Sequence, residues 1–283
     1  MIFASAVIAV LIIALLAYQD AEFRYTLNDR ISKIGSSFEL KQTAVKVKST
    51  TLYALLEDDR TTLDDSLLLI NTEHLLSDGQ ALDIVEYNDS GVYMNSCATD
   101  AYMKLSQDVK ERFDEKLYVS SAYRTAEEQA QTIVEEGSKA QAVGASEHQA
   151  GLALDVYVMY YGGAAFLKHD AGQWVNSNCQ DYGFIIRYPY YGENETGISY
   201  EPWHLRYVGM PHSEIIAKGS MTLEGYIETL KQDLFFTYES GGESGDSWLI
   251  VRRVGEEFDI PDEYISAVVS PDNCGGYILT FKV

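Results

Sequence analysis

Residues 146–155 read SEHQAGLALD, a polar turn that runs into a short apolar segment. His148 and Asp155 are seven positions apart with Gly151 between them, a spacing that does not suit one helix face. It suits a loop residue and a strand residue that face a common point. Residues 152–158 are therefore predicted to form a buried strand that fixes the position of Asp155.

A second polar stretch, EPWH at residues 201–204, follows further along the chain. His148, Asp155 and His204 are the donor types that hold a hydrolytic zinc ion, with a fourth position left for water. Glu201 is held extended by the proline after it, and it can accept a proton from that water without binding the metal. On residue types alone, structural histidines and a capping aspartate remain the alternative.

The stretch SAYR at residues 121–124 precedes a predicted helix. Thr125 and Glu128 form a capping-box pattern, so the helix is expected to begin at Ala126. Arg124 then lies in the turn between a strand end and a helix start. A residue in such a turn can point into a cleft from a rigid support.

These stretches together resemble the VanY-like D-alanyl-D-alanine carboxypeptidases, which are zinc peptidases of the bacterial cell wall. SEHQAGLALD keeps every fixed position of the family pattern S-x-H-x-x-G-x-A-x-D, EPWH keeps E-x-W-H, and SAYR keeps S-x-Y-R. Strands and helices also mix without a regular βαβ alternation, which indicates an α+β fold with a mostly antiparallel central sheet flanked by helices. The resemblance implies the D-Ala-D-Ala carboxypeptidase or Hedgehog-like zinc fold.

The resemblance also implies roles for individual residues. The implied zinc ligands are His148, Asp155 and His204. Glu201 is implied as the general base. Arg124 would bind the substrate carboxylate or the developing oxyanion, since a guanidinium suits either role. Gln129 and Ser146 are weaker candidates for substrate contacts.

The expected activity is zinc-dependent removal of the terminal D-Ala from a peptidoglycan stem peptide or its lipid-linked precursor. One alternative is L,D-carboxypeptidase activity on tetrapeptide stems. An alternative of another class is a non-catalytic, zinc-containing module that binds the cell wall. Glu201 and Arg124 argue against that module, because a purely structural zinc site requires neither residue.

The composition limits the partners. The chain has 283 residues and a formal net charge of −22, from 21 Lys and Arg against 43 Asp and Glu. This balance argues against a nucleic-acid partner, because phosphate contacts require clustered basic residues. The cysteines, Cys97, Cys179 and Cys274, form no CxxC pair, so a disulfide with one free thiol and three reduced thiols both stay open.

The N-terminal residues 2–18 contain no charged side chain. They predict a transmembrane anchor or signal segment in residues 1–19 and a single-pass protein of the bacterial cell membrane. The catalytic domain is expected outside the cytoplasm, where the stem peptides lie, or secreted if the segment is cleaved. The basic residues that follow the segment favour the opposite orientation. The remaining expected divisions are a spacer at 20–62, the zinc carboxypeptidase domain at 63–236 and a small β appendage at 248–283.

Overall fold

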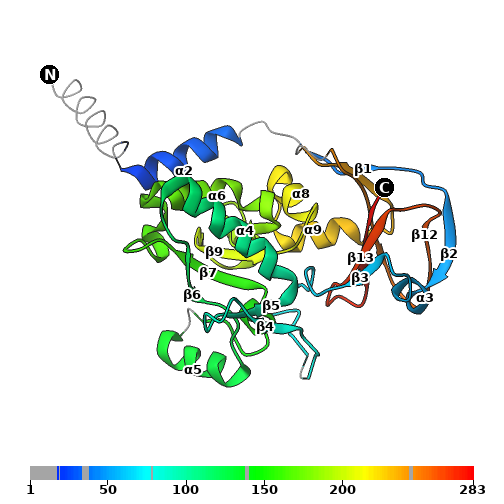
Figure 1. Cartoon of the computed structure of the whole chain (residues 1–283), viewed down its shortest axis with the longest axis horizontal. Helices are drawn as coiled ribbons and strands as arrows, with labels where there is room; N and C mark the ends of the chain where they lie inside the picture. Colours follow the sequence, from blue (N-terminus) through cyan, green and yellow to red (C-terminus); the bar gives the residue numbers. More distant parts are fainter. Residues whose placement is uncertain (1–17, 19, 34–37, 78, 138–139, 242–244) are drawn as a thin grey trace.

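The structure is a computed structural model of the chain and describes residues 18, 20–33, 38–77, 79–137, 140–241 and 245–283. Helices and sheets alternate irregularly along the chain, which confirms the α+β expectation. Figure 1 shows a body of helices around one sheet and, beside it, a body of strands. The strands of the second body come from both ends of the sequence.

The central sheet has the order β6-β7-β9-β8, and all its pairs are antiparallel. Its strands are β6 (Tyr118–Ser121), β7 (Ala153–Tyr157), β8 (Phe184–Ile186) and β9 (His204–Tyr207). Every second residue of these strands faces helices α4 (Ser96–Phe113) and α6 (Asp170–Asn178). The core on this face contains Tyr102, Leu105, Val109, Leu154, Val156, Val175, Phe184 and Leu205. The intervening residues of the strands face the opposite side, where the polar motifs gather.

Shorter elements surround the sheet. They are α2 (Ala21–Ser32), β4 (Ile84–Glu86), β5 (Tyr93–Asn95), α5 (Ala126–Glu136), η2 (Glu147–Ala150), η3 (Gly163–Lys168), η4 (Cys179–Tyr182), α7 (Glu193–Thr196), α8 (His212–Gly219) and α9 (Leu223–Leu230). Helix α5 begins at the predicted residue, and both bonds of its capping box are present between Thr125 and Glu128. The cap thus fixes the turn that carries Arg124.

The second body is a six-stranded sheet of order β1-β10-β11-β14-β13-β3, with β12 paired to β2. Its elements are β1 (Lys41–Gln42), β2 (Val47–Thr51), α3 (Leu52–Leu56), β3 (Thr61–Leu63), β10 (Phe236–Glu239), β11 (Ser247–Arg253), β12 (Glu257–Pro261), β13 (Ser266–Pro271) and β14 (Tyr277–Lys282). Three of its strands therefore lie in the segment expected to be a spacer. That segment and the expected C-terminal appendage belong to the same strand body, because strands β1, β2 and β3 complete the pairing of β10, β12 and β13.

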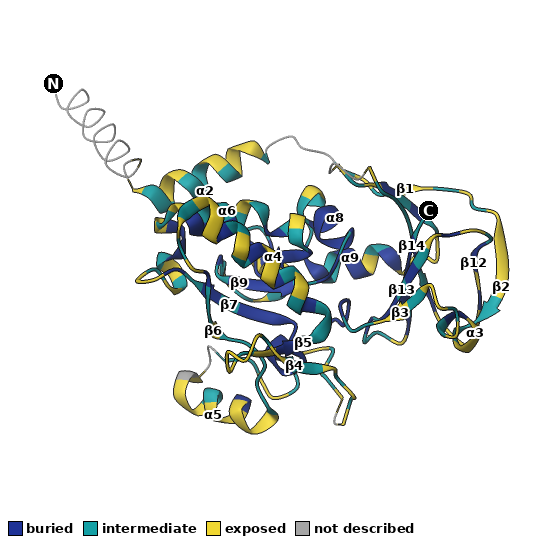
Figure 2. Cartoon of the chain, viewed as in Figure 1, coloured by how far each residue is buried: buried dark blue, intermediate teal, exposed yellow. Residues whose placement is uncertain are grey.

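Two apolar clusters hold the strand body in place, and Figure 2 shows dark, buried residues in both bodies. One cluster joins helices α8 and α9 to strands β10, β11 and β14, with Tyr226 and Ile278 among its buried members. The other fills the strand body itself around Phe281. His212 lies buried at the junction, where its ring nitrogens contact the Tyr226 hydroxyl at 2.6 Å and the Thr280 hydroxyl at 2.8 Å.

The expected membrane helix requires a correction. Among the described residues, no helix is both long enough and apolar enough to cross a membrane. The segment that motivated the expectation falls almost entirely outside the described residues. No described helix therefore supports the expected single-pass membrane location.

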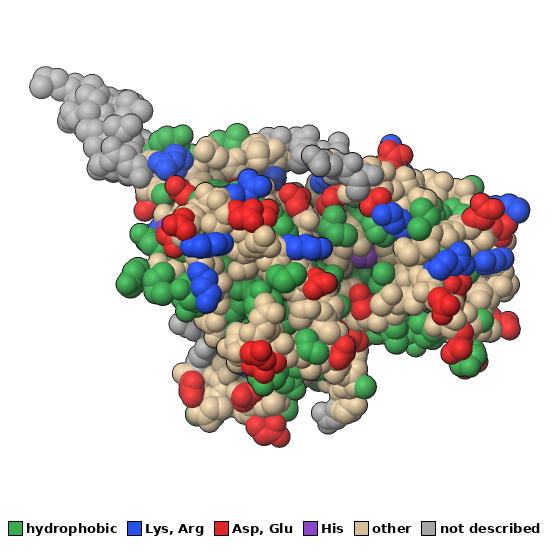
Figure 3. Space-filling model, in the orientation of Figure 1, with side chains coloured by type: hydrophobic (Ala, Val, Ile, Leu, Met, Phe, Trp, Pro, Cys, Tyr) green, Lys and Arg blue, Asp and Glu red, His purple; other side chains and the backbone are tan. Residues whose placement is uncertain are grey.

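The surface and the cysteines add two observations. Figure 3 shows acidic side chains spread over the visible face, with basic side chains between them.

Cys97, Cys179 and Cys274 are all free thiols, which answers the question of their pairing.

Candidate metal centre and active site

The two polar motifs meet on the sheet face opposite the helices. Asp155 on β7 and His204 on β9 are direct partners in the antiparallel register. His148 reaches the same point from η2, and one ligand atom from each of the three residues lies within 4.8 Å of the others. The His204 Nδ1 atom is 2.9 Å from Asp155 Oδ1, and the His148 Nε2 atom is 3.5 Å from Asp155 Oδ2. The structure thus brings the three predicted ligands together.

Gly151 makes this convergence possible. It ends η2 with a φ of +65°, a left-handed conformation that costs glycine little. A Cβ atom there would lie 2.6 Å from the backbone nitrogen of Asn95. The chain can therefore turn from His148 into β7 only because this residue has no side chain.

The protein orients the ligand atoms by hydrogen bonding. His148 Nδ1 is 2.9 Å from the carbonyl oxygen of Ala122. A carbonyl only accepts, so Nδ1 carries the proton, and Nε2 presents its lone pair towards Asp155. Neutral imidazole and carboxylate are the forms that bind a divalent metal. The three residues therefore fit a zinc ion.

Burial and neighbouring charges shift the pKa values of the three candidate ligands in different directions. Burial lowers the pKa of His148. Burial also opposes the charged form of His204, but the Asp155 carboxylate outweighs it and raises the pKa of that ring. Burial favours the neutral form of Asp155, but the two histidines hold the pKa of its carboxyl far below the usual range. Asp155 is thus an ionised ligand at neutral pH.

Glu201 lies beside the ligand group. Its carboxylate is 3.6 Å from His204 Nδ1, and its side chain is 31% exposed, against 8% for the His204 side chain. Its backbone N–H donates to the carbonyl of Tyr188, whose ring centroid lies 4.9 Å from that of His204. Glu201 is therefore held next to the metal position while part of its carboxylate still reaches water.

Arg124 approaches from the turn before α5. Its backbone N–H donates to the carbonyl of His148 at 3.1 Å, which ties the turn to a ligand residue. Its guanidinium lies 3.4 Å from the Thr132 hydroxyl and 3.5 Å from the Ser146 hydroxyl. Gln129 donates to the Gln141 carbonyl at 2.7 Å and is fully buried.

A buried ionic network lies behind the ligands, and sequence reasoning did not find it. Glu147 Oε1 accepts hydrogen bonds of 2.7 Å from both Arg187 and Arg206. Arg187 also donates to both carboxylate oxygens of Glu224. Burial opposes ionisation of Glu147, yet the two guanidinium groups keep its pKa low. The sequence does carry a signal for this network, because Arg187 and Arg206 each interrupt an otherwise apolar run, in residues 183–189 and 203–208.

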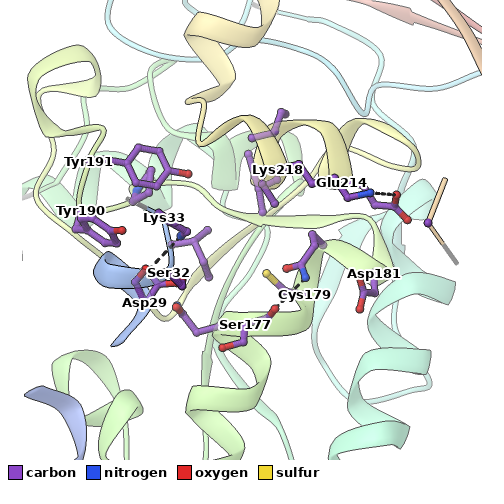
Figure 4. A pocket seen from close by; sticks show the side chains of 18 of the residues that line it. Asp29, Ser32, Lys33, Ser177, Cys179, Asp181, Tyr190, Tyr191, Glu214 and Lys218 are labelled. Atoms are coloured by element: carbon purple, nitrogen blue, oxygen red, sulfur yellow. Dashed lines mark hydrogen bonds and ion pairs between the residues drawn. The ribbon is translucent and has the colours of Figure 1, made fainter. Parts of the chain in front are cut away.

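A separate cavity lies at the β8 edge of the sheet, and its lining includes none of the candidate ligands. It has a volume of about 890 Å³. Figure 4 shows Lys33 near Tyr190 and Tyr191 on one side of this cavity, with Cys179 and Lys218 further along it. The candidate ligands instead come from η2, β7 and β9, so the candidate active site and this cavity are distinct places.

Comparison with known proteins points to one family. Residues 91–210 match VanY, the D-alanyl-D-alanine carboxypeptidase family. The chain is 31% identical over 232 residues to a D-alanyl-D-alanine carboxypeptidase of Enterococcus faecium, covering 76% of this chain and 74% of that protein.

Two solved structures are also similar. One is a variant of the vancomycin-resistance D,D-pentapeptidase VanY in complex with Zn(II), with a TM-score of 0.51 and 27% identity, covering 57% of this chain and 98% of that one. The other is the LD-carboxypeptidase LdcB, described with its basis of peptidoglycan recognition, with a TM-score of 0.52 and 29% identity, covering 68% of this chain and 97% of that one.

Proposed function

Because this chain belongs to the VanY family of D-alanyl-D-alanine carboxypeptidases, we propose that it removes the terminal D-Ala from peptidoglycan stem peptides at the site formed by His148, Asp155 and His204. The chain is a zinc-dependent D,D-carboxypeptidase. The observation that carries the proposal is the convergence of three ligand atoms within 4.8 Å, with the Glu201 carboxylate beside them.

The proposed roles follow from the geometry. A zinc ion held by the three ligands would activate a water molecule and polarise the scissile carbonyl. Glu201 accepts the proton of the attacking water and then gives it to the departing amine. The Glu201 side chain can perform both proton transfers, because it lies next to the metal ligand His204 and is still partly exposed to water.

Arg124 is proposed to bind the terminal carboxylate of the substrate. A guanidinium stays charged and matches a carboxylate with two parallel hydrogen bonds. The Ser146 hydroxyl, 3.5 Å from this guanidinium, is placed to share the same carboxylate. Gln129 would need to release the Gln141 carbonyl before it could contact a ligand, so its proposed role is to hold the loop before Ser146.

The test is to incubate the purified protein with a pentapeptide stem and a tetrapeptide stem, each with and without a chelator. The proposal expects D-Ala release from the pentapeptide, none from the tetrapeptide, and loss of release after chelation. Release from the tetrapeptide alone would replace D,D with L,D specificity. Release that survives complete metal removal would refute the metal-dependent mechanism.

A further inference from the structure

The amide side chain of Asn176, on helix α6, is bound to both neighbours of Glu201 in the sequence. Its Nδ2 atom donates to the backbone carbonyl of Pro202 at 3.1 Å. Its Oδ1 atom accepts a hydrogen bond from the Tyr200 hydroxyl, also at 3.1 Å. A carbonyl only accepts, so the amide nitrogen must face Pro202, which leaves the amide oxygen for the hydroxyl. Asn176 therefore holds the residue before Glu201 and the residue after it with the two ends of one planar group.

The backbone of Glu201 is also fixed by hydrogen bonds of its own. Its N–H donates to the Tyr188 carbonyl at 3.0 Å, and its carbonyl accepts from the His204 N–H at 3.1 Å. Both bonds lead to the chain segments on either side of the same loop. Asn176 binds the loop from helix α6, so it adds a support from a different element of the fold.

Helix α2 contributes a further hydrogen bond to this amide. It lies beside α6 (Figure 1), and its Tyr25 hydroxyl donates to Asn176 Oδ1 at 2.9 Å. The same hydroxyl lies 2.7 Å from the Ser177 hydroxyl, which can donate to it. An amide oxygen has two lone pairs, so it can accept from Tyr25 and Tyr200 together. Burial raises the pKa of both phenols, so both stay protonated and able to donate.

A general base must be held at hydrogen-bond distance from the water whose proton it accepts. The Glu201 side chain is 31% exposed, so packing encloses it less than it encloses the ligand His204, and its position depends more on its backbone. We propose that Asn176 is a positioning residue for the reaction, which places the Glu201 carboxylate by binding the residues on either side of it, with Tyr25 of α2 as its support. This inference rests on the proposed function. It gives a role to α2, which precedes the residues that match the family.

The test is a double-mutant cycle on the zinc-loaded full chain, with single-turnover release of D-Ala from a pentapeptide stem. Asn176→Ala should keep its zinc but slow release about tenfold, because a displacement of about 1 Å near the chemistry costs up to about a hundredfold. In the Glu201→Gln background, Asn176→Ala should slow release less than about twofold, because the base through which it acts is already absent. An effect on folding or on the metal ligands would instead slow release by the same factor in both backgrounds.

Two further variants separate the bond to the loop from the amide itself. The matched control is Asn178→Ala, because Asn178 is on the same helix and donates to the Trp174 carbonyl at 2.7 Å, a bond that stays within α6. It should release D-Ala within about twofold of the wild-type rate. Tyr25→Phe removes one hydrogen bond to Asn176 and should slow release about threefold, again only where Glu201 is present.

The outcomes distinguish the positioning role from the proposed function. Release at the wild-type rate by Asn176→Ala, or equal slowing by this substitution in both backgrounds, would overturn the positioning role, while D-Ala release by the wild type still supported the proposed function. Equal slowing by Asn178→Ala and Asn176→Ala would also overturn it. No release by the wild type would overturn the proposed function, and the positioning role with it.

Discussion

Replacing Glu147 with glutamine tests the buried ionic network behind the ligands. The side chains of Glu147, Arg187 and Arg206 are all at most 1% exposed, and the Glu147 carboxylate accepts a 2.7 Å hydrogen bond from each arginine. Glu147→Gln keeps the shape but removes the charge. It leaves two buried guanidinium groups opposite only one remaining carboxylate, that of Glu224.

The size of the effect follows from this burial. Removing one partner of a buried ion pair costs about 3–5 kcal/mol, which is a large part of the 5–15 kcal/mol that typically stabilises a native protein. For a chain of this size, about 4 kcal/mol corresponds to a midpoint of thermal unfolding lower by about 8–16 °C. Because Glu147 adjoins His148, the apparent zinc affinity should fall in the same variant.

The assay is urea and thermal unfolding of Glu147→Gln beside a matched control, Glu228→Gln. Glu228 forms an ion pair with Lys231, but its side chain is 73% exposed, so Glu228→Gln should leave the free energy of unfolding nearly unchanged. If Glu147→Gln unfolds within about 1 kcal/mol of the wild type, the network does not stabilise the fold.

Three further predictions concern the metal ligand His204, the turn at Gly151 and the buried ring of His212. His204→Ala should lose its bound zinc in metal analysis, and a normal zinc content would remove it from the ligand set. Gly151→Ala should unfold at least about 1 kcal/mol more easily than Gly91→Ala, because both have positive φ but only the first Cβ meets other atoms. Burial lowers the pKa of His212 to about 3, so below pH 6.5 the unfolded chain binds a proton that the folded chain does not. Stability should therefore fall by about 1.4 kcal/mol per pH unit from 6.5 towards 3, and an equally steep fall in His212→Asn would contradict this.

The local elements of the site could be predicted because each has a strong signal in a few neighbouring residues. The capping box marks the start of α5, and the apolar run around Asp155 marks β7. The glycine between His148 and Asp155 indicates the turn that brings them together. These features depend on backbone conformation within one segment, so they can be inferred from the sequence of that segment.

The strand body could not be predicted in the same way. Strand β2 reads VKSTT, and its residues are exposed or half-buried, so no alternating apolar pattern marks it. Its partner β12 lies about two hundred residues later, and the pairing depends on how the intervening domain folds. The network around Glu147 was missed for the same reason. Its four members come from η2, β9, α9 and the segment just after β8, and only the fold brings their charges together.

The role of Glu201 is tested most directly by comparing zinc-loaded wild type with zinc-loaded Glu201→Gln on a pentapeptide stem in a single turnover. Both proteins should hold one zinc ion, and the variant should release D-Ala at least about a thousandfold more slowly, because the glutamine cannot accept the proton of the attacking water. D-Ala release at the wild-type rate by a zinc-loaded Glu201→Gln variant would show that Glu201 is not the general base.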